Sequence, residues 1–471
     1  MTGRMISISP QRARYVAVDW ITSTVAFLLF NIYRFYFTKE TGDLAGFLLS
    51  RKLVSEQLLI PTAMLCIYWL SGYYNQPFNK SRLQELVTTF FSAVLNTAGI
   101  FLLMLINDVR GKRTDDYEML LILLLLLFVM TYAGRLTITF LTRRRFKKRK
   151  MSFKTLMVGN SECAHRTAEE LGTPKGARYG YRVVGFVSIP GERDAAGEKA
   201  HSLREIGDLC RELNIDQIII SPEKYDDQRV LELLYDLYDL HIPVKISPDT
   251  LSFVTSGIHL EDIYGDPLVD LTSPRISDSA KNLKRTADVI VSAAALLILS
   301  PVYAAVAAAV KLTSEGPVIY RQRRIGIHHK PFTIYKFRTM RTDAEAAGPQ
   351  LSDENDPRVT KVGRVMRKYR IDELPQFWNV LKGDMSLVGP RPEREYFIRQ
   401  IVKEAPYYTL VHQVRPGITS WGMVKYGYAS TVGQMVERTR FDLIYLSNMS
   451  TMVDIKILIH TLKTVMTGKG K

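Results

Sequence analysis

The sequence predicts a membrane protein of mixed α and α/β class. It would contain a bundle of four transmembrane helices, a small parallel α/β domain, and a second α/β domain with a broken apolar helix. Three observations predict this: apolar residues concentrate before residue 142 and again at 286–310, strand and helix patterns alternate through 153–248, and basic residues flank the apolar segments. Hydrophobic residues make up 46% of the 471-residue chain, enough for packed cores in two or three domains.

Four apolar stretches fill the first part of the chain, and each approaches the roughly 20 residues needed to cross a bilayer. They cover residues 16–37, 53–74, 86–106 and 119–141. The alternative is the buried bundle of a soluble protein, and the leucine-rich run at 120–127, which has no polar face, disfavours it. Asp19 and Arg135 lie near the ends of the first and fourth stretches, where we expect their side chains to reach the membrane interface.

The formal net charge of +16 is consistent with binding to nucleic acid, to an anionic membrane face or to a phosphorylated substrate. Its distribution favours the last two, because residues 143–150 hold seven basic side chains in eight directly after the fourth stretch. Cytosolic flanks of membrane helices are basic, so an even number of spans places both ends of the bundle in the cytosol. Nucleic-acid binding is discounted, since the charge lies beside apolar segments without an aromatic platform.

Residues 153–248 alternate between short β-rich runs and amphipathic helices, which predicts a small parallel sheet of Rossmann-like type. The predicted strands are 153–159, 182–188, 216–221 and 242–247, and the predicted helices are 202–213 and 227–240. The first strand ends in Gly159-Asn160-Ser161 and not in G-x-G-x-x-G, which is a weak dinucleotide signal. The ligand of this domain therefore stays open, including the alternative that it binds nothing. Residues 249–283 are predicted to form a linker.

A fifth apolar stretch at 287–310 is long enough to span a membrane, but two features predict a broken helix that enters one leaflet and returns. Ser300-Pro301 lies at its middle, where proline kinks a helix and serine can satisfy a freed carbonyl. Basic residues flank both ends, which places both in the cytosol. A fully spanning helix is the alternative, and it would put the next domain on the opposite side of the membrane.

Residue types that bind phosphate are dense after the broken helix. The alternation in 332–337 predicts a strand on which Lys336 and Arg338 share one face. Two neighbouring cations suit a diphosphate, because arginine binds its oxygens in a bidentate fashion and lysine acts as a point charge. The alternative is a solvated basic strand.

A helix with an apolar face is predicted to follow residue 373. Four apolar residues recur at helical spacing: Leu374, Phe377, Trp378 and Leu381. Pro375 fits the start of this helix and Gly383 its end, so Asp372 and Glu373 lie at its N-terminus. Ordinary capping is one role for such acids. The other is chemical, because a carboxylate among the upstream cations can stay ionised and attack phosphorus while its neighbour helps to hold Mg²⁺.

These segments carry a resemblance to a known family. KFRTM at 336–340, RKYRIDELPQFWNVLKGDMSLVGPRPE at 367–393 and the Ser-Pro apolar helix resemble the bacterial sugar transferase family, the monotopic phosphoglycosyl transferases. The four leading spans and the α/β domain are similar to its large members, the undecaprenyl-phosphate glucose or galactose phosphotransferases. The resulting division has the bundle at 1–142, the Rossmann-like domain and linker at 143–280, and a catalytic domain at 281–471 with a re-entrant helix at 286–310.

The resemblance implies transfer of a hexose-1-phosphate from a UDP-sugar to undecaprenyl phosphate, with release of UMP. This is the priming step of exopolysaccharide, capsule or O-antigen (lipopolysaccharide) synthesis. Asp372 would be the nucleophile that carries a covalent phosphosugar, and Glu373 would assist it and share Mg²⁺ with it. The implied phosphate-binding residues are Lys336, Arg338, Arg367 and Arg391. Ser300 and Pro301 would form the turning point of the re-entrant helix.

The resemblance also implies a multi-pass protein of the bacterial inner membrane with its catalytic domain on the cytosolic face, and we expect a homodimer. The sugar stays open between glucose, galactose and N-acetylated forms. A nucleotide-sugar dehydratase or epimerase is disfavoured, because the chain has neither G-x-G-x-x-G nor Tyr-x-x-x-Lys. An inactive membrane scaffold is disfavoured by the Asp-Glu pair among cations. The apolar C-terminal stretch at 452–466 either lies in the membrane interface or packs into a core.

Overall fold

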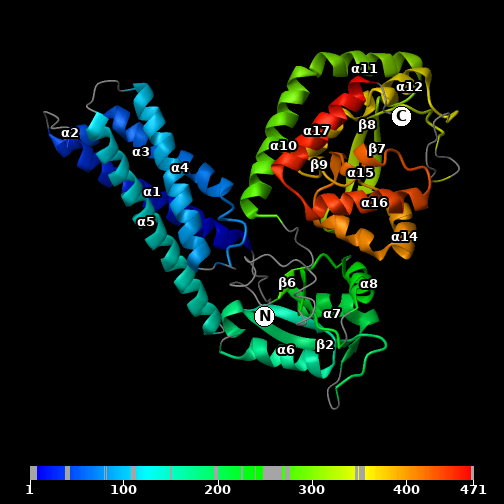
Figure 1. The fold of residues 1–471 in the computed structure, drawn as a ribbon, viewed down its shortest axis with the longest axis horizontal. Helices are drawn as coiled ribbons and strands as arrows, with labels where there is room; N and C mark the ends of the chain where they lie inside the picture. Colours follow the sequence, from blue (N-terminus) through cyan, green and yellow to red (C-terminus); the bar gives the residue numbers. More distant parts are fainter. Residues whose placement is uncertain are drawn as a thin grey trace. The chain divides into compact units, whose positions relative to one another are not determined.

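A computed structural model describes the fold of most of the chain. The described residues are 8–37, 43–78, 80, 82–107, 113–148, 151–174, 176–195, 200–223, 226–238, 240–247, 268–270, 276–344, 348 and 356–467. The chain divides into two compact units (Figure 1). The first comprises Met1–Glu223, Ser247–Val269 and Ser277–Asn282, and the second comprises Lys224–Ile246, Asp270–Ile276 and Leu283–Lys471.

The first unit begins with a bundle of long helices. They are α1 (Ile8–Phe37), α3 (Arg51–Leu70), α4 (Arg82–Asn107) and α5 (Arg113–Lys147), with a short α2 (Leu44–Leu48). Each of the four is long and apolar enough to cross a membrane, which confirms the four predicted apolar helices. Many large apolar side chains point outward, including Leu58, Leu59, Phe91, Leu103 and Leu121. Polar side chains are buried inside, an arrangement that suits a lipid environment.

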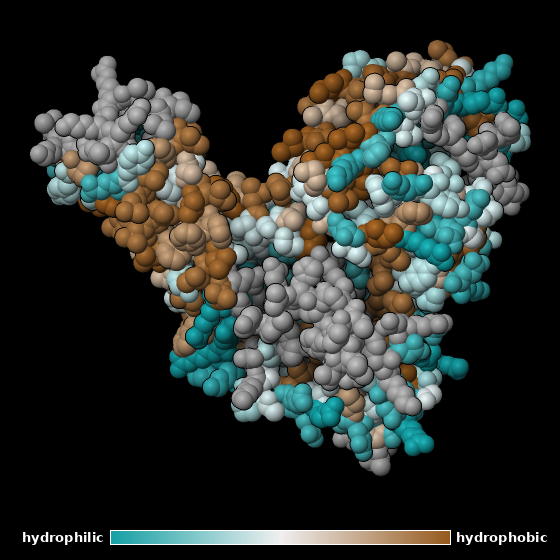
Figure 2. All heavy atoms as spheres, in the orientation of Figure 1, coloured by the Kyte–Doolittle hydropathy of each residue, from teal (hydrophilic) through white to brown (hydrophobic). Residues whose placement is uncertain are grey.

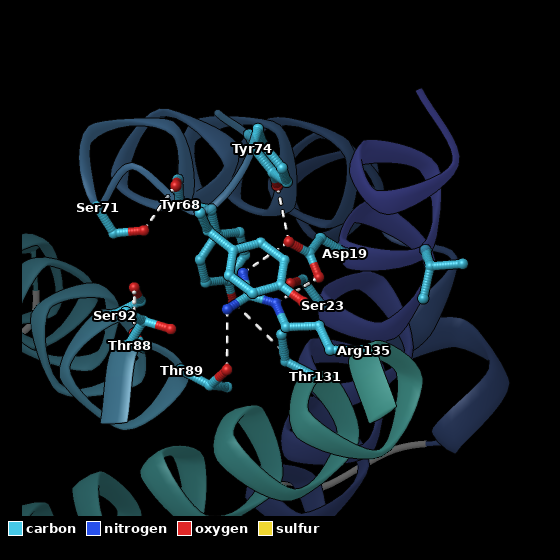
Figure 3. Close-up of polar contacts among 12 residues, drawn as sticks. Asp19, Ser23, Tyr68, Ser71, Tyr74, Thr88, Thr89, Ser92, Thr131 and Arg135 are labelled. Carbon is cyan, nitrogen blue, oxygen red and sulfur yellow. Dashed lines mark hydrogen bonds and ion pairs between the residues drawn. The ribbon is translucent and has the colours of Figure 1, made fainter. Parts of the chain in front are cut away.

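A buried ion pair lies inside this bundle (Figure 3). Arg135 of α5 donates from Nε and Nη2 to the two carboxylate oxygens of Asp19 on α1, at 2.9 and 2.6 Å. Thr89 of α4 accepts from Nη1 at 2.9 Å, and the Tyr74 hydroxyl donates to Asp19 at 2.7 Å. The prediction that Asp19 and Arg135 reach the membrane interface is therefore wrong. Helix packing buries both charges completely, and each compensates the burial of the other.

A six-stranded sheet follows α5. Its strand order is β3-β2-β1-β4-β5-β6, with β1 (Phe153–Val158), β2 (Tyr181–Ser188), β3 (His201–Ser202), β4 (Gln217–Ile220), β5 (Val244–Ile246) and β6 (Val269–Asp270). The pairs β1–β2, β1–β4 and β2–β3 are parallel, as predicted. The three isoleucines of β4 are buried, as expected for a central strand covered on both faces. The strands β3 and β6 were not predicted, because two residues are too short to form a pattern.

Helices and 3₁₀ turns accompany the sheet. The helices are α6 (Glu162–Gly172), α7 (Ile206–Leu213) and α8 (Asp227–Tyr238), and the turns are η1 (Gly176–Tyr179) and η2 (Leu203–Glu205). Both predicted helices are confirmed as α7 and α8. Of the linker predicted at 249–283, residues 249–267 and 271–275 lie outside the described residues, and the prediction is wrong for residues 278–283, which are helical.

A bent helix pair leads into the C-terminal part. α10 (Asp278–Ile298) and α11 (Ser300–Thr313) meet at an angle of 62°. Pro301 occupies the first turn of α11, where its missing N–H is harmless, and the Ser300 hydroxyl donates to the Leu297 carbonyl at 2.8 Å. The helix is therefore interrupted at the predicted Ser-Pro step. The pair is longer than the predicted apolar segment at both ends.

The rest of the second unit surrounds two small sheets. An antiparallel hairpin joins β7 (Ile319–Ile325) to β8 (Pro331–Phe337), and β9 (Ser386–Val388) pairs in parallel with β10 (Gly417–Thr419). The helices are α12 (Lys361–Lys368), α13 (Gln376–Lys382), α14 (Glu395–Glu404), α15 (Trp421–Lys425), α16 (Val432–Ser447) and α17 (Thr451–Met466). Three 3₁₀ turns, η4 (Ile327–His329), η5 (Ile371–Glu373) and η6 (Pro406–Gln413), complete it.

This unit carries an apolar outer face, which Figure 2 shows as brown surface over α10 and α17. Its exposed side chains include Ile290, Leu297, Ile298, Leu312, Ile459 and Leu462. Trp378 of α13 is also 56% exposed. The apolar side predicted for α13 is therefore not its buried side, which consists of Gln376, Asn379 and Val380. Apolar exposure of this extent marks a surface that meets a membrane or a partner.

Candidate active site

Asp372 and Glu373 lie in the 3₁₀ turn η5, between α12 and α13. Arg370 leads into the turn with a left-handed φ of 53°, and Pro375 precedes the first residue of α13. Gly383 ends α13 with a φ of 97°, a conformation that strains any residue with a Cβ. The predicted start and end of the helix are confirmed. The acidic pair, however, occupies a separate turn ahead of the helix and not its first turn.

Three cations surround the Glu373 carboxylate. Lys336 Nζ lies 2.8 Å and Arg391 Nη2 3.4 Å from Oε1, and Arg370 Nη1 lies 3.5 Å from Oε2. Burial would raise the pKa of Glu373, but Lys336, Arg391 and Arg370 outweigh it and hold the pKa well below its usual value. Glu373 therefore stays ionised and keeps these cations together.

Asp372 has a different environment, although it is the next residue. Its side chain is buried and makes no hydrogen bond or ion pair with any described residue. Burial and the neighbouring Glu373 raise the pKa of Asp372 to about 6, against the opposing effect of Lys336, Arg367 and Arg370. Two adjacent carboxylates with pKa values moved in opposite directions suit two different chemical roles. A carboxylate that lies near cations but forms no hydrogen bond or ion pair with the described residues can act as a nucleophile.

Arg367 belongs to α12, which packs against Thr339, two residues after the end of β8. Its Nε donates to Thr339 Oγ1 at 3.0 Å. The helix approaches closely because residue 363 is glycine, and a Cβ there would lie 2.1 Å from the Thr339 carbonyl oxygen. Arg367 therefore lies near enough for its charge to lower the pKa of Asp372.

Arg338 has a different position from the other predicted phosphate-binding residues. Its Nη2 donates to the Ser314 carbonyl at 2.8 Å and to Ser314 Oγ at 2.9 Å, and its Nη1 donates to the Glu315 carbonyl. Strand β8 ends at Phe337, so the alternation that would place Lys336 and Arg338 on one face does not continue. Lys336 turns to Glu373, whereas Arg338 binds the end of α11. A phosphate-binding role for Arg338 stays a prediction.

Two further residues support the site and were not found from the sequence. Tyr428, in the loop between α15 and α16, lies with its hydroxyl 3.3 Å from Arg391 Nη2 and its ring centroid 5.3 Å from the Arg391 guanidinium carbon. Asn379 of α13 donates to the Thr333 carbonyl at 2.7 Å and accepts from the Tyr335 N–H at 3.1 Å. It thereby fixes α13 to β8. The one sequence signal for this role of Asn379 is its spacing of three residues from Gln376, which places both polar side chains on the same face of the helix.

The acidic pair is also the predicted magnesium site. The described residues contain no group of three or more His, Cys, Asp or Glu side chains that could hold a metal ion. Mg²⁺ is commonly held by one or two carboxylates together with substrate phosphates. Asp372 and Glu373 fit such a site when a diphosphate supplies the other ligands, with the oxygens of Asp372 the less engaged.

A buried acidic pair among lysine and arginine side chains, in a unit with an apolar outer face, suits an enzyme that acts on phosphate groups at an apolar surface. The family model described as bacterial sugar transferase matches residues 279–468, which include the whole site. A relative from Caulobacter vibrioides, named UDP-glucose:undecaprenyl-phosphate glucose-1-phosphate transferase, is 38% identical over 41% of this chain and 73% of its own length. The chain belongs to the bacterial sugar transferase family.

Two longer relatives match as well. The UDP-glucose:undecaprenyl-phosphate glucose-1-phosphate transferase of Escherichia coli K12 is 37% identical over 60% of this chain and 61% of its own length. The UDP-N-acetylgalactosamine-undecaprenyl-phosphate N-acetylgalactosaminephosphotransferase of Aeromonas hydrophila is 40% identical over 49% and 54%. This chain therefore matches between one half and two thirds of the length of these two relatives.

Proposed function

We propose that this protein transfers a hexose-1-phosphate from a UDP-sugar to undecaprenyl phosphate and releases UMP. The observation that carries the proposal is the acidic pair, in which Asp372 forms no hydrogen bond or ion pair with the described residues and Glu373 is held by three cations. Membership of the bacterial sugar transferase family supports the reaction class, and the relatives are named for glucose and N-acetylgalactosamine. The sugar used by this protein is left to experiment.

In the first step, a carboxylate oxygen of Asp372 attacks the phosphorus that bears the sugar. The bond from that phosphorus to the oxygen bridging the two phosphates breaks, and UMP leaves with the electron pair. Lys336, Arg367 and Arg391 neutralise the charge of the diphosphate, since arginine and lysine side chains bind phosphate oxygens strongly. Glu373 remains ionised and holds Lys336 and Arg391 in place. Mg²⁺ held by the acidic pair and the phosphates would withdraw charge from the phosphate oxygens.

In the second step, a phosphate oxygen of undecaprenyl phosphate attacks the same phosphorus. The bond between phosphorus and the Asp372 oxygen breaks, so the carboxylate is regenerated and the lipid-linked diphosphate sugar is released. Neither step requires a net proton transfer. The two steps form a ping-pong cycle, because UMP leaves before the lipid reacts.

The apolar face of the second unit supports a location at a membrane surface. The α10–α11 pair is bent by 62°, and basic residues flank both of its ends, so we propose that it enters and leaves the cytosolic leaflet of the bacterial inner membrane. The exposed side of α17 and Trp378 would lie in the same interface. One substrate is water-borne and the other has its phosphate at the headgroups, so a site at this level meets both. The homodimer and the polysaccharide pathway stay predictions.

Exchange of labelled UMP tests the covalent step directly. With the purified protein, a panel of UDP-sugars and no lipid acceptor, labelled UMP is expected to appear in one UDP-sugar, because the first step reverses on the enzyme. Addition of undecaprenyl phosphate should then give net UMP release. Net release without any exchange would exclude the Asp372 intermediate, and absence of both with every sugar would overturn the proposed function.

The pH dependence of the first step follows from the pKa of Asp372. The nucleophile must be ionised, and its pKa is about 6, so kcat/KM is expected to fall about tenfold per pH unit below that value. Glu373 does not contribute to this limb, because its pKa lies well below its usual value. The measurement is kcat/KM for the UDP-sugar from about pH 5 to pH 8, with the melting temperature recorded at each pH. A profile that stays flat down to about pH 5 would contradict the assignment.

A further inference from the structure

One hydrogen bond connects the bent helix pair to the turn that carries the acidic pair. The Tyr303 hydroxyl of α11 donates to the carbonyl oxygen of Leu374 at 2.6 Å. Leu374 directly follows Glu373. The same tyrosine ring lies 5.7 Å, centroid to centroid, from Phe337 of β8, the neighbour of Lys336. Tyr303 thus contacts two of the segments that supply charged groups to the site.

The backbone of the turn that carries Asp372 and Glu373 is held by long hydrogen bonds, in addition to the ion pairs of the Glu373 side chain. It is a three-residue 3₁₀ turn, whose hydrogen bonds from the Glu373 and Leu374 amides to the Arg370 and Ile371 carbonyls both measure 3.2 Å. Such turns are short and have poorer hydrogen-bond geometry than an α-helix. The hydrogen bond from the Tyr303 hydroxyl therefore adds a restraint on the position of the turn from outside it.

The other end of α11 is attached to the site as well. Arg338, just after β8, donates to the carbonyls of Ser314 and Glu315, at the C-terminal end of the helix. Between these two attachments, α11 packs against residues on both sides of the acidic pair. This small core contains Tyr303, Val306, Val310, Phe337, Met366, Ile371 and Leu374. One side of α11 is therefore part of the framework of the site.

The opposite side of the same helix is exposed and apolar. Val302 and Leu312 of α11 are exposed, and so are Leu297 and Ile298 at the end of α10. If this side lies in the bilayer, as the proposed function requires, the depth of α11 in the lipid determines where Tyr303 holds the Leu374 carbonyl. We infer that Tyr303 is a positioning residue that couples the insertion of α11 to the geometry of Asp372 and Glu373. This inference rests on the proposed function.

Tyr303→Phe tests the coupling, because it removes the hydroxyl and keeps the ring against Phe337. In lipid nanodiscs we expect kcat to fall about 10- to 100-fold, since a misplaced catalytic group slows chemistry, while KM for the UDP-sugar changes less than about twofold. Thr313→Val is the matched control. It removes a hydroxyl from the same helix whose bonds among the described residues go only to the Ala309 and Val310 carbonyls within α11, and it should keep wild-type kcat.

A second measurement separates positioning from a purely structural role. On transfer from nanodiscs to detergent micelles, the wild type and Thr313→Val should lose activity by the same factor, and Tyr303→Phe should change much less, because its turn no longer responds to α11. Equal kcat for Tyr303→Phe and wild type, or equal loss on transfer for all three proteins, would overturn the inference. Wild-type protein that releases no UMP in either environment would instead refute the proposed function.

Discussion

Asp372→Asn is expected to reduce UMP release by at least about 1,000-fold while the protein stays folded in the membrane. The amide has nearly the shape of the carboxylate but cannot form an acyl phosphate with the sugar phosphate. The stability should not fall. Burial and Glu373 raise the pKa of Asp372 to about 6, so at neutral pH the side chain is mostly ionised, but its charge costs the folded protein stability relative to the unfolded chain, and a neutral side chain removes that cost. A melting temperature equal to or above that of the wild type is the expected companion result.

The control for this variant is Asp343→Asn, which makes the same chemical change at an exposed acid of the same unit. It should retain wild-type turnover. UMP exchange in the absence of lipid should disappear in Asp372→Asn and persist in Asp343→Asn. Turnover near the wild-type rate in Asp372→Asn, or labelled phosphosugar bound covalently to that variant, would show that another group is the nucleophile.

Breaking the Asp19–Arg135 pair is expected to have the largest effect on stability. Arg135→Met leaves the Asp19 carboxylate buried with the Tyr74 hydroxyl as its remaining donor in the described part of the chain. Asp19→Asn leaves a buried guanidinium without the counter-charge of Asp19. Removing one partner of a buried pair costs about 3–5 kcal/mol, because the other charge stays uncompensated. We expect each variant to unfold at a much lower denaturant concentration or temperature in the same detergent, measured by loss of helical signal.

The double variant Asp19→Asn with Arg135→Met tests the physical reason. It removes both charges, so it should recover most of the stability lost by either single change, and the coupling should be evident in a double-mutant cycle. Arg144→Met, at an exposed arginine of α5, is the control and should change the free energy of unfolding by less than about 0.5 kcal/mol. If the two single effects add in the double variant, uncompensated charge is not the cause of the instability.

Much of the fold was predictable because local patterns set it. The apolar runs predicted the four long helices, the β-rich runs predicted β1, β2, β4 and β5, and Ser300-Pro301 predicted the helix break. The candidate site was predictable in part, since Asp372 and Glu373 are adjacent and basic residues precede them. Lys336 and Arg391 contact Glu373, and Arg367 lies near enough for its charge to lower the pKa of Asp372.

Residues close along the chain specify which segments are apolar, where helices start and stop, and which neighbouring carboxylates can act together, so these features can be predicted without coordinates. The partners of residues far apart in the sequence depend on the packing of the folded chain. This packing buried Arg135 against Asp19, turned Arg338 to α11 while Lys336 turned to Glu373, and brought the Tyr303 hydroxyl to Leu374. Such pairs depend on how whole helices and strands pack, and the spacing of residues within one segment does not contain that information.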